Sequence, residues 1–341
     1  MSKTIRNSYY KYLTYEKLLE AHLKSRKGKG YRKEIILFNL KQEEYIMWLL
    51  EKLQTKTYKH GGYSTFYVTE PKLRKIEKSK YIDRIVHRWL VDNFLEPAFV
   101  PQFINTSYAC LKNRGMHKAC LDVQKAMKHC QRIWDEYYIL KMDIAKYFDN
   151  INKNILLNIL KRKIKDKDVL WLIEEILYAQ KREKGLEIGN YTSQMFANIY
   201  LNEIDQYVKH ILKIKWYFRY LDDSVLYVKT KQEAKEVLEK IKIFLKENLQ
   251  LELNKKTQIF KSKQGVNFCG YKINPYRLKI RDKGKRKLKK KVKLLKEKIK
   301  REEITSKEAQ KYLAGHLGYI KIANTYNLES KLFYQENRQG K

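Results

Sequence analysis

Residues 214–229, IKWYFRYLDDSVLYVK, decide the fold of this chain. Apolar and aromatic residues stand on both sides of Leu221-Asp222, and this pattern predicts two short strands joined by a tight turn. The turn brings Asp222 and Asp223 side by side, where two like charges repel each other unless a cation lies between them. An Asp-Asp turn is also a common surface feature, so the hairpin alone leaves a metal site and a charged loop as alternatives.

A further carboxylate stands near the end of another predicted strand. Residues 137–144, YYILKMDI, have the continuous apolar character of a buried strand, and Asp143 lies close to its end. Two-metal phosphoryl transfer uses two ions about 3.5–4 Å apart, which need carboxylates from both sides. A strand-end carboxylate that meets the hairpin aspartates would supply them. The pattern therefore makes Asp143, Asp222 and Asp223 candidate metal ligands and catalytic residues.

The remaining hydrophobic patterns predict a mixed α+β fold. Residues 63–78 alternate apolar and polar side chains around Pro71, which predicts a strand, a turn and a strand. A helix is expected next, with one apolar face formed by Ile82, Ile85, Val86, Trp89 and Leu90. Further helices are predicted at about 153–180, 191–213 and 231–247, with short strands around 257–273. This order has no repeating strand–helix unit and predicts an antiparallel central sheet.

The chain carries a large excess of positive charge. Its 74 Lys and Arg residues against 38 Asp and Glu residues give a net charge of +36. Such an excess destabilises the compact state unless a polyanion neutralises it, and nucleic acid and a membrane surface are the two candidates. The charge is spread along the whole chain, which favours nucleic acid. From residue 284 the tail predicts an amphipathic basic helix, with an apolar stripe of Leu288, Val292, Leu295 and Ile299.

Cysteine spacing and hydropathy restrict the class further. The four cysteines, Cys110, Cys120, Cys130 and Cys269, form no CxxC pair and no zinc pattern, which suits a reducing cytosol, and we expect buried packing roles for the first three. No apolar run approaches the ~20 residues that span a bilayer, and the N-terminus lacks the apolar segment of a signal peptide. The sequence predicts a cytoplasmic protein with no membrane partner.

Several of these stretches resemble one family. DIAKYFDNI at 143–151 and YLDD at 220–223 resemble motifs A and C of reverse transcriptases. The other family motifs are resembled in the same order by 69–86 (fingers), 94–119 (the segment leading into the palm), 185–205 (motif B), 251–259 (motif D), 267–273 (primer grip) and 312–328 (thumb). The resemblance covers roughly residues 60–335.

The resemblance implies a right-hand polymerase with fingers, a palm on an antiparallel sheet and a helical thumb. The implied domains are an N-terminal helical, basic extension at 1–60, fingers at 61–135, a palm at 136–275 that includes part of the fingers at about 150–190, and a basic helical thumb at 276–341. After the thumb ends near residue 335, we expect no room for a ribonuclease H, endonuclease or recombinase domain.

The resemblance also assigns roles to single residues. It implies an RNA-directed DNA polymerase, a nucleotidyltransferase that uses two Mg²⁺ ions, with Mn²⁺ as a substitute. The implied metal ligands are Asp143, Asp222, Asp223 and the carbonyl of Ile144, and the implied general acid is Lys256, with Lys255 as its alternative. The implied dNTP contacts are Lys72, Arg74, Phe148 as the steric gate against a 2′-hydroxyl, Ile188, Gly189 and Gln194. The implied primer grip is Phe268, Cys269, Gly270 and Tyr271.

Motif B narrows the subtype. IGNYTSQ at 188–194 is similar to the enzymes of diversity-generating retroelements, whereas retroviral and group II intron enzymes carry Gln-Gly in place of Ile188-Gly189. An aliphatic side chain removes a hydrogen-bonding check on the new base pair, and in this family the consequence is misincorporation opposite template adenine. The implied partners are a structured template RNA, an RNA/cDNA duplex, dNTPs and a small basic accessory protein.

Two other functions remain open at this stage. A bacterial antiviral defence reverse transcriptase with a dedicated non-coding RNA would keep the same palm. A non-catalytic RNA-binding protein on this scaffold would be expected to lose carboxylates, so the presence of Asp143, Asp222 and Asp223 favours catalysis. We expect a ribonucleoprotein in the cytoplasm of a bacterium, encoded by the bacterium or by a phage.

Overall fold

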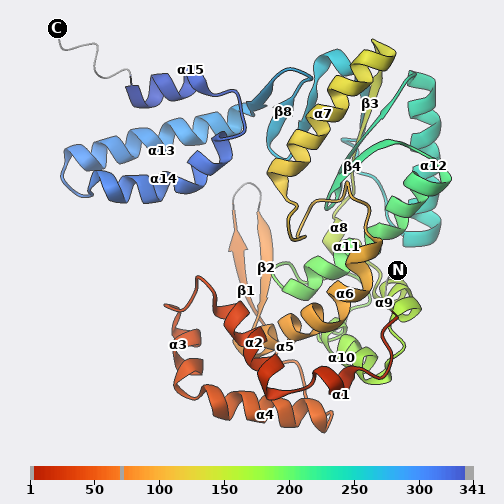
Figure 1. Cartoon of the computed structure of the whole chain (residues 1–341), viewed down its shortest axis with the longest axis vertical. Helices are drawn as coiled ribbons and strands as arrows, with labels where there is room; N and C mark the ends of the chain where they lie inside the picture. Colours follow the sequence, from red (N-terminus) through yellow and green to blue (C-terminus); the bar gives the residue numbers. More distant parts are fainter. Residues whose placement is uncertain (1–3, 70–72, 335–341) are drawn as a thin grey trace. The chain divides into compact units, whose positions relative to one another are not determined.

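A computed structural model describes residues 4–69 and 73–334 of the chain (Figure 1). Internal contacts divide it into two compact units. Unit 1 comprises Met1–Asn105, Ile144–Lys213 and Glu239–Lys255, and unit 2 comprises Thr106–Asp143, Ile214–Leu238 and Lys256–Lys341. Lys72, a predicted dNTP contact, lies outside the described residues.

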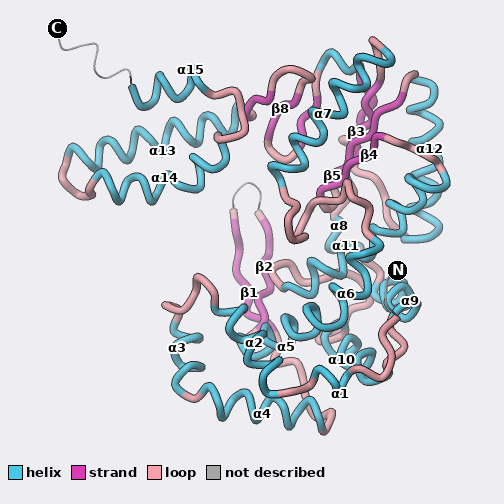
Figure 2. Tube along the Cα trace, viewed as in Figure 1, coloured by secondary structure: helices cyan, strands magenta, loops and turns pink. Residues whose placement is uncertain are grey.

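Unit 1 is mainly helical and contains one two-stranded sheet (Figure 2). Strands β1 (Tyr63–Val68) and β2 (Arg74–Ser79) pair antiparallel, which confirms the predicted strand, turn and strand. The helical elements of unit 1 are α1 (Tyr9–Tyr12), α2 (Tyr15–Arg26), α3 (Lys33–Leu40), α4 (Gln42–Gln54), α5 (Tyr81–Leu90), η1 (Val91–Leu95), α6 (Glu96–Phe99), η2 (Val100–Gln102), α8 (Tyr147–Asn150), α9 (Lys153–Lys163), α10 (Lys167–Leu177), α11 (Tyr191–Gln206) and η3 (Tyr207–Ile211).

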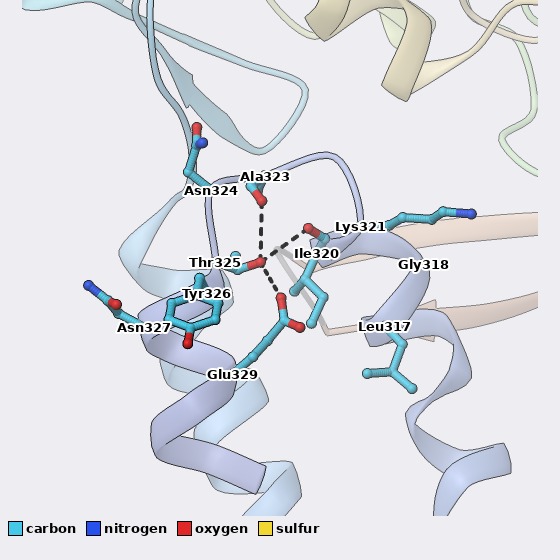
Figure 3. Close-up of a pocket in the computed structure, with 10 residues that line it drawn as sticks. All are labelled: Leu317, Gly318, Ile320, Lys321, Ala323, Asn324, Thr325, Tyr326, Asn327 and Glu329. Carbon is cyan, nitrogen blue, oxygen red and sulfur yellow. Dashed lines mark hydrogen bonds between the residues drawn. The ribbon is translucent and has the colours of Figure 1, made fainter. Parts of the chain in front are cut away.

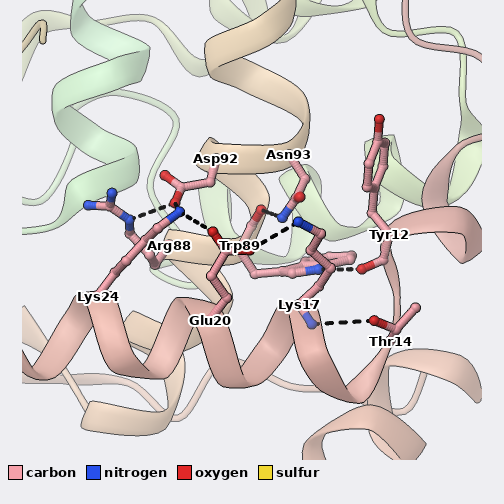
Figure 4. A network of polar contacts seen from close by, with 9 residues as sticks. All are labelled: Tyr12, Thr14, Lys17, Glu20, Lys24, Arg88, Trp89, Asp92 and Asn93. Carbon is pink, nitrogen blue, oxygen red and sulfur yellow. Dashed lines mark hydrogen bonds and ion pairs between the residues drawn. The ribbon is translucent and has the colours of Figure 1, made fainter.

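Helix α5 forms part of the core of unit 1. Its predicted apolar face is confirmed for Ile85, Val86, Trp89 and Leu90, which are all fully buried, whereas Ile82 is half-buried. Polar contacts then attach α2 to the α5–η1 segment, as Figure 4 shows: Asp92 accepts from Lys24 Nζ at 2.9 Å and from Arg88 Nε at 3.0 Å. The apolar face buries four large side chains, and the ion pairs of the partly buried Asp92 add the attachment of α2.

The helical region predicted at about 153–180 consists of two helices, α9 and α10. Asp166 begins the second one, because its Oδ1 accepts from the backbone N–H of Asp168 at 3.1 Å and of Val169 at 3.3 Å. Its Oδ2 also accepts from the backbone N–H groups of Ser8 and Tyr9, at 2.6 and 2.9 Å. An N-cap that satisfies otherwise unpaired N–H groups starts a new helix at a point where the apolar pattern alone continues.

Unit 2 is built on a four-stranded sheet in the order β4-β5-β3-β6. Its strands are β3 (Tyr138–Asp143), β4 (Trp216–Tyr220), β5 (Asp223–Val228) and β6 (Gln258–Lys261), and every pairing is antiparallel. A second antiparallel sheet has the order β7 (Val266–Phe268), β8 (Tyr271–Ile273) and β9 (Leu278–Ile280), and η4 (Ser262–Gln264) precedes it. The prediction of an α+β fold with an antiparallel central sheet is confirmed. Helix α12 (Lys231–Leu249) has residues in both units.

Helix α7 (Met116–Trp134) contributes a face of small and medium side chains to the core of unit 2. Cys120 and Cys130 lie on this face and are fully buried, as predicted for packing cysteines. The prediction is wrong for Cys110, which is exposed and lies before the helix at a φ of +56°, so it has no apolar face to join. Cys269 is half-buried.

The C-terminal part of unit 2 is helical and comprises α13 (Asp282–Lys300), α14 (Ser306–Ile320), α15 (Tyr326–Glu329) and η5 (Ser330–Tyr334). Leu288, Val292 and Leu295 are the buried residues of α13, which confirms the predicted amphipathic helix. A surface pocket of about 860 Å³ lies where α14 turns into α15 (Figure 3). Thr325 holds this turn, because its hydroxyl contacts the Glu329 carboxylate and lies 3.3 Å from the Ala323 carbonyl.

Among the described helices, no stretch combines the length and the hydropathy needed to cross a bilayer.

Candidate active site

The register of the central sheet places two of the predicted carboxylates opposite each other. Asp143 is the last residue of β3, Asp223 is the first residue of β5, and the two are antiparallel partners. Side chains of directly opposite residues start about 4.5–5.5 Å apart at their Cβ atoms. Asp222 lies in the two-residue turn between β4 and β5, so all three aspartates gather at one end of the sheet in unit 2.

The turn at Leu221-Asp222 is strained, and contacts of a buried arginine on β4 stabilise it. Leu221 has a φ of +51°, a conformation that costs a non-glycine residue roughly 1–2 kcal/mol. Arg219 on β4 is almost fully buried, and its Nη1 donates to the Leu221 carbonyl at 3.2 Å. The backbone of Arg219 is held in turn by Thr106 and Tyr108, with N···O distances of 2.9 and 3.0 Å. Buried contacts therefore hold the Asp-Asp tip in one conformation.

Lys141 is a site residue that sequence reasoning missed. Its ammonium lies 2.7 and 3.0 Å from the two carboxylate oxygens of Asp223, and 2.5 Å from the backbone carbonyl of Asn267. It also lies 5.8 Å from the ring centroid of Phe268. The available signal was its position two residues before Asp143, which puts both side chains on the same face of a strand.

The carboxylate of Asp223 is in an unfavourable environment for its charge. Burial raises the pKa of Asp223 to about 6; Lys141 opposes this rise, and the charges of Asp143 and Asp222 add to it. The influence of both neighbours shows that the three carboxylates interact electrostatically. A group of this kind gains stability from a nearby cation.

The donor set fits a divalent metal ion, although the side chains are not assembled around one. Carboxylate oxygens are the ligands that Mg²⁺ and Mn²⁺ prefer. Across residues 4–69 and 73–334, no three acidic, His or Cys side chains are close enough to hold an ion as they stand. Lys141 instead occupies both oxygens of Asp223. Ile144, whose carbonyl was a predicted ligand, is buried and forms an isolated bridge with Leu253.

The predicted primer-grip residues lie on the hairpin of β7 and β8. Cys269 and Gly270 form its tip with φ values of +46° and +85°. Tyr319 on α14 fixes this tip: its hydroxyl donates to the Gly270 carbonyl at 2.5 Å, and its ring stacks on that of Tyr271 at 4.5 Å. A Cβ at Gly270 would lie 2.3 Å from the Tyr319 oxygen, so the close approach requires glycine. Sequence reasoning did not single out Tyr319.

Lys141 joins this hairpin to the aspartates. The Lys141 ammonium donates both to the Asn267 carbonyl on β7 and to the Asp223 carboxylate on β5. Cys269 lies at the tip of the same hairpin, and a hydrogen bond with Cys120, burial and the charge of Asp223 raise the pKa of its thiol. Unit 2 therefore contains both the three predicted metal-binding aspartates and the predicted primer grip. Lys256 lies exposed in the turn before β6.

Of the predicted dNTP contacts, those that the structure describes lie in unit 1, on β2, α8, α11 and the loop at 185–190. Arg74 is the exposed first residue of β2. The Ile188 carbonyl accepts from the Glu77 N–H at 3.1 Å, and the Phe148 carbonyl accepts from the Leu186 N–H at 2.8 Å. The loop is thus bonded to both β2 and α8. Gly189 has a φ of +119°, and Gln194 lies half-buried on α11.

Asn190 and Glu77 hold this loop in place, and sequence reasoning named neither. The buried Asn190 amide accepts from the Ser79 N–H at 3.1 Å and from its hydroxyl at 2.6 Å, and donates to the Glu77 carbonyl at 3.0 Å. Burial acts to raise the pKa of Glu77, but hydrogen bonds from Lys75, Gln180 and Arg182 outweigh it and hold the pKa at about 2. The loop before α11 is therefore fastened to β2 by buried polar contacts.

Comparisons with known proteins identify the family of this chain. A family model described as "Reverse transcriptase (RNA-dependent DNA polymerase)" matches residues 62–273. Protein YkfC of Escherichia coli (strain K12) is 26% identical over 243 residues, which cover 59% of this chain and 63% of that protein. The group II intron-encoded protein LtrA of Lactococcus lactis subsp. cremoris is 24% identical over 306 residues, which cover 68% of this chain and 50% of that protein.

Among solved structures, apo telomerase from Candida tropicalis has a TM-score of 0.49 at 13% sequence identity, covering 65% of this chain and 49% of that chain. The chain spans 63% and 50% of the lengths of YkfC and LtrA.

Proposed function

Because this chain belongs to the reverse transcriptase (RNA-dependent DNA polymerase) family, we propose that it synthesises cDNA on an RNA template. The observation that carries the proposal is the pairing of Asp143 with Asp223 across the central strands, with Asp222 in the adjoining turn. A structural role would not require three mutually repelling carboxylates at one sheet end. The positive charge of the chain suits the two polyanions of this reaction, an RNA template and an RNA/cDNA duplex.

The residues have the following proposed roles. Asp143, Asp222 and Asp223 would hold two Mg²⁺ ions, which stabilise the charge that develops on the attacking and leaving oxygens. Arg74, assisted by Lys72, would bind the dNTP triphosphate, because a guanidinium pairs with phosphate oxygens in a bidentate manner. Other proposed roles are the steric gate for Phe148, proton donation to pyrophosphate for Lys256, and primer binding for the hairpin tip at 268–271.

Substitution of the turn carboxylates tests this function. Asp222→Ala with Asp223→Ala should lower dNTP incorporation on a primed RNA template by at least about a thousandfold, since metal ligation supplies several kcal/mol of barrier lowering. Asp135→Asn is the matched control, because Asp135 is an exposed carboxylate of unit 2 and Asn has nearly the same shape without the charge. Incorporation that survives the double substitution would refute the proposal.

For the subtype, we propose the error-prone enzyme of a diversity-generating retroelement. The proposal rests on Ile188 and the following residues through Gln194. Ile188 is half-buried, and its backbone is bonded to β2, the strand that begins with Arg74. An aliphatic side chain in the nucleotide site cannot hydrogen-bond to a base, so a mispaired nucleotide loses less binding free energy relative to the correct one. For an enzyme of this subtype, the proposed binding partners are a structured template RNA and a small basic accessory protein.

Sequencing of cDNA made on a defined RNA template tests the subtype. The wild-type enzyme should misincorporate opposite adenine, and Ile188→Gln should lower that error rate by about tenfold, which corresponds to one polar contact. Ile188→Leu, which keeps an aliphatic side chain, should retain the adenine errors. An adenine error rate that is low in the wild type, or unchanged by Ile188→Gln, would favour a defence reverse transcriptase with a dedicated non-coding RNA.

A further inference from the structure

We propose that Lys141 is a built-in cation for Asp223: it ties this carboxylate to the β7–β8 hairpin in the metal-free protein and releases it when a divalent ion binds. The inference rests on the proposed function, because it concerns the carboxylates that would hold the ions. It assigns Lys141 a positioning role, through its contacts with Asp223 and Asn267, rather than contact with substrate.

The contacts of Lys141 use its full donor capacity. An ammonium has three N–H donors, and the acceptors of Lys141 are both oxygens of Asp223 and the carbonyl of Asn267. Its side chain is 24% exposed and that of Asp223 is 31% exposed, so bulk water screens the pair incompletely. The ammonium therefore stands where a positive charge is required among three carboxylates.

The same contacts conflict with metal ligation. An ion bound by Asp223 needs at least one of the two carboxylate oxygens that Lys141 now contacts. A divalent charge at that position also repels the nearby ammonium. Ion binding and the Lys141–Asp223 pair therefore compete for one carboxylate.

Release of Asp223 has a consequence at the hairpin. Strand β7 is an edge strand of its sheet, and Lys141 reaches its Asn267 carbonyl from β3 of the other sheet in unit 2. When Asp223 no longer anchors the ammonium, this link between the two sheets loosens. Because linkage is reciprocal, a primer that draws Lys141 toward the hairpin should in turn raise the affinity of Asp223 for the ion.

Metal binding and hydrogen exchange measured at pH 8 on the full chain test the inference. Lys141→Met should bind Mg²⁺ about threefold or more tightly than wild type in calorimetric titrations, because the competing charge is gone. In the metal-free state its amides at 266–273 should exchange roughly tenfold faster, since a charge-assisted hydrogen bond is lost. Addition of Mg²⁺ should accelerate exchange of these amides in wild type and leave it unchanged in Lys141→Met.

Three further variants serve as controls. Lys279→Met removes an equal charge from an exposed position on β9 and should match wild type in both measurements. Lys141→Arg keeps the charge and should remain within about twofold of wild type, which guards against a folding defect of Lys141→Met. Asp222→Asn shows whether the ion binds at these carboxylates.

The outcomes separate the two proposals. If Asp222→Asn abolishes Mg²⁺ binding and DNA synthesis while Lys141→Met binds Mg²⁺ like wild type or more weakly, the role of Lys141 is overturned and the proposed function stands. Hairpin exchange that is the same in Lys141→Met and wild type overturns it as well. If Asp222→Asn leaves both Mg²⁺ binding and synthesis intact, the proposed function fails, and the role of Lys141 fails with it.

Discussion

Single residues at the active-site end of unit 2 are held in conformations and charge states that the fold would not favour by itself. Leu221 and Cys269 both have positive φ values without being glycine, and both lie in turns beside the predicted ligands or the primer grip. Strain of this kind persists only where surrounding contacts enforce it. Here Arg219 and the α14 residue Tyr319 supply those contacts.

Asp223 should make the metal-free protein depend on pH in an unusual direction. Its folded pKa of about 6 lies above the ordinary 3.8, so the folded state holds the proton more tightly. Its contribution to the free energy of unfolding is therefore largest below about pH 4 and is lost as pH rises through 6. Asp223→Asn should raise stability at pH 8 by on the order of 1–3 kcal/mol relative to wild type, and by little at pH 4.

Urea denaturation of both proteins in EDTA between pH 4 and pH 8 measures this difference. The difference should grow between pH 4 and pH 6 and then level off. A difference that is constant over the range would show that the pKa of Asp223 is ordinary.

Gly270 should be intolerant of a side chain, in contrast to a glycine on a nearby helix. At Gly270 an added Cβ meets the Tyr319 oxygen at 2.3 Å, and φ is +85°, so Gly270→Ala should destabilise by about 1–3 kcal/mol. At Gly315 within α14, an added Cβ meets no described atom within 4 Å, so Gly315→Ala should be neutral or stabilising by up to about 1 kcal/mol. Thermal unfolding of the two variants measures this difference. Equal melting temperatures would contradict the steric requirement for glycine at position 270.

At the scale of elements, two connections position the candidate site within the separate units. In unit 2, Lys141 joins β3 and β5 to the β7–β8 hairpin. In unit 1, Asn190 fastens the loop before α11 to β2. Both connections join segments that lie more than 80 residues apart in the chain, so each depends on the completed fold.

Removal of the Asn190 amide should detach the loop from β2. Asn190→Ala leaves the Ser79 N–H and hydroxyl and the Glu77 carbonyl without their side-chain partner, and each unsatisfied buried group costs about 1–3 kcal/mol. We expect the free energy of unfolding to fall by roughly 2–4 kcal/mol and proteolysis between residues 180 and 190 to become faster. Asn248→Ala on the exposed face of α12 is the control and should change stability by less than about 0.5 kcal/mol.

Helix α13 should supply phosphate contacts. Lys289, Lys293, Lys296 and Lys300 follow one stripe and line a pocket of about 330 Å³ with Lys331. Replacing the four by Gln should reduce the slope of log affinity against log salt for single-stranded RNA by up to about 3, at roughly 0.7 per contact. The matched control replaces Lys235, Lys240, Lys242 and Lys246 of α12, where glutamates are interspersed, and should change the slope less. Filter binding across a salt series measures both; equal slopes would refute the role of α13.

At the scale of the whole molecule, the charge of +36 cannot be compensated within the chain. Several lysines and arginines form ion pairs with acidic residues. The 74 basic residues nevertheless far outnumber the 38 acidic residues. The excess therefore favours a stable complex with a polyanion, in line with the proposed RNA partner.

The local elements of this protein and the identity of its acidic residues can be predicted from the amino-acid sequence. Apolar runs predicted the β4–β5 hairpin and the strand that contains Asp143, and a stripe of period 3.6 predicted the amphipathic helix α13, because burial and backbone geometry impose these patterns on neighbouring residues. The break between α9 and α10 was missed, since Asp166 caps α10 and also accepts hydrogen bonds from the distant Ser8 and Tyr9.

The contacts between these residues depend on the folded chain. The pairing of Asp143 with Asp223, the bridge from Lys141 to Asn267 and the docking of Asn190 on Ser79 all join distant segments. Local patterns carry no record of which strands become neighbours, because that choice depends on burying a shared core and on satisfying the polar groups that burial traps. Lys141 therefore looked like one lysine among many, and its place between the aspartates and the hairpin became visible only in the folded chain.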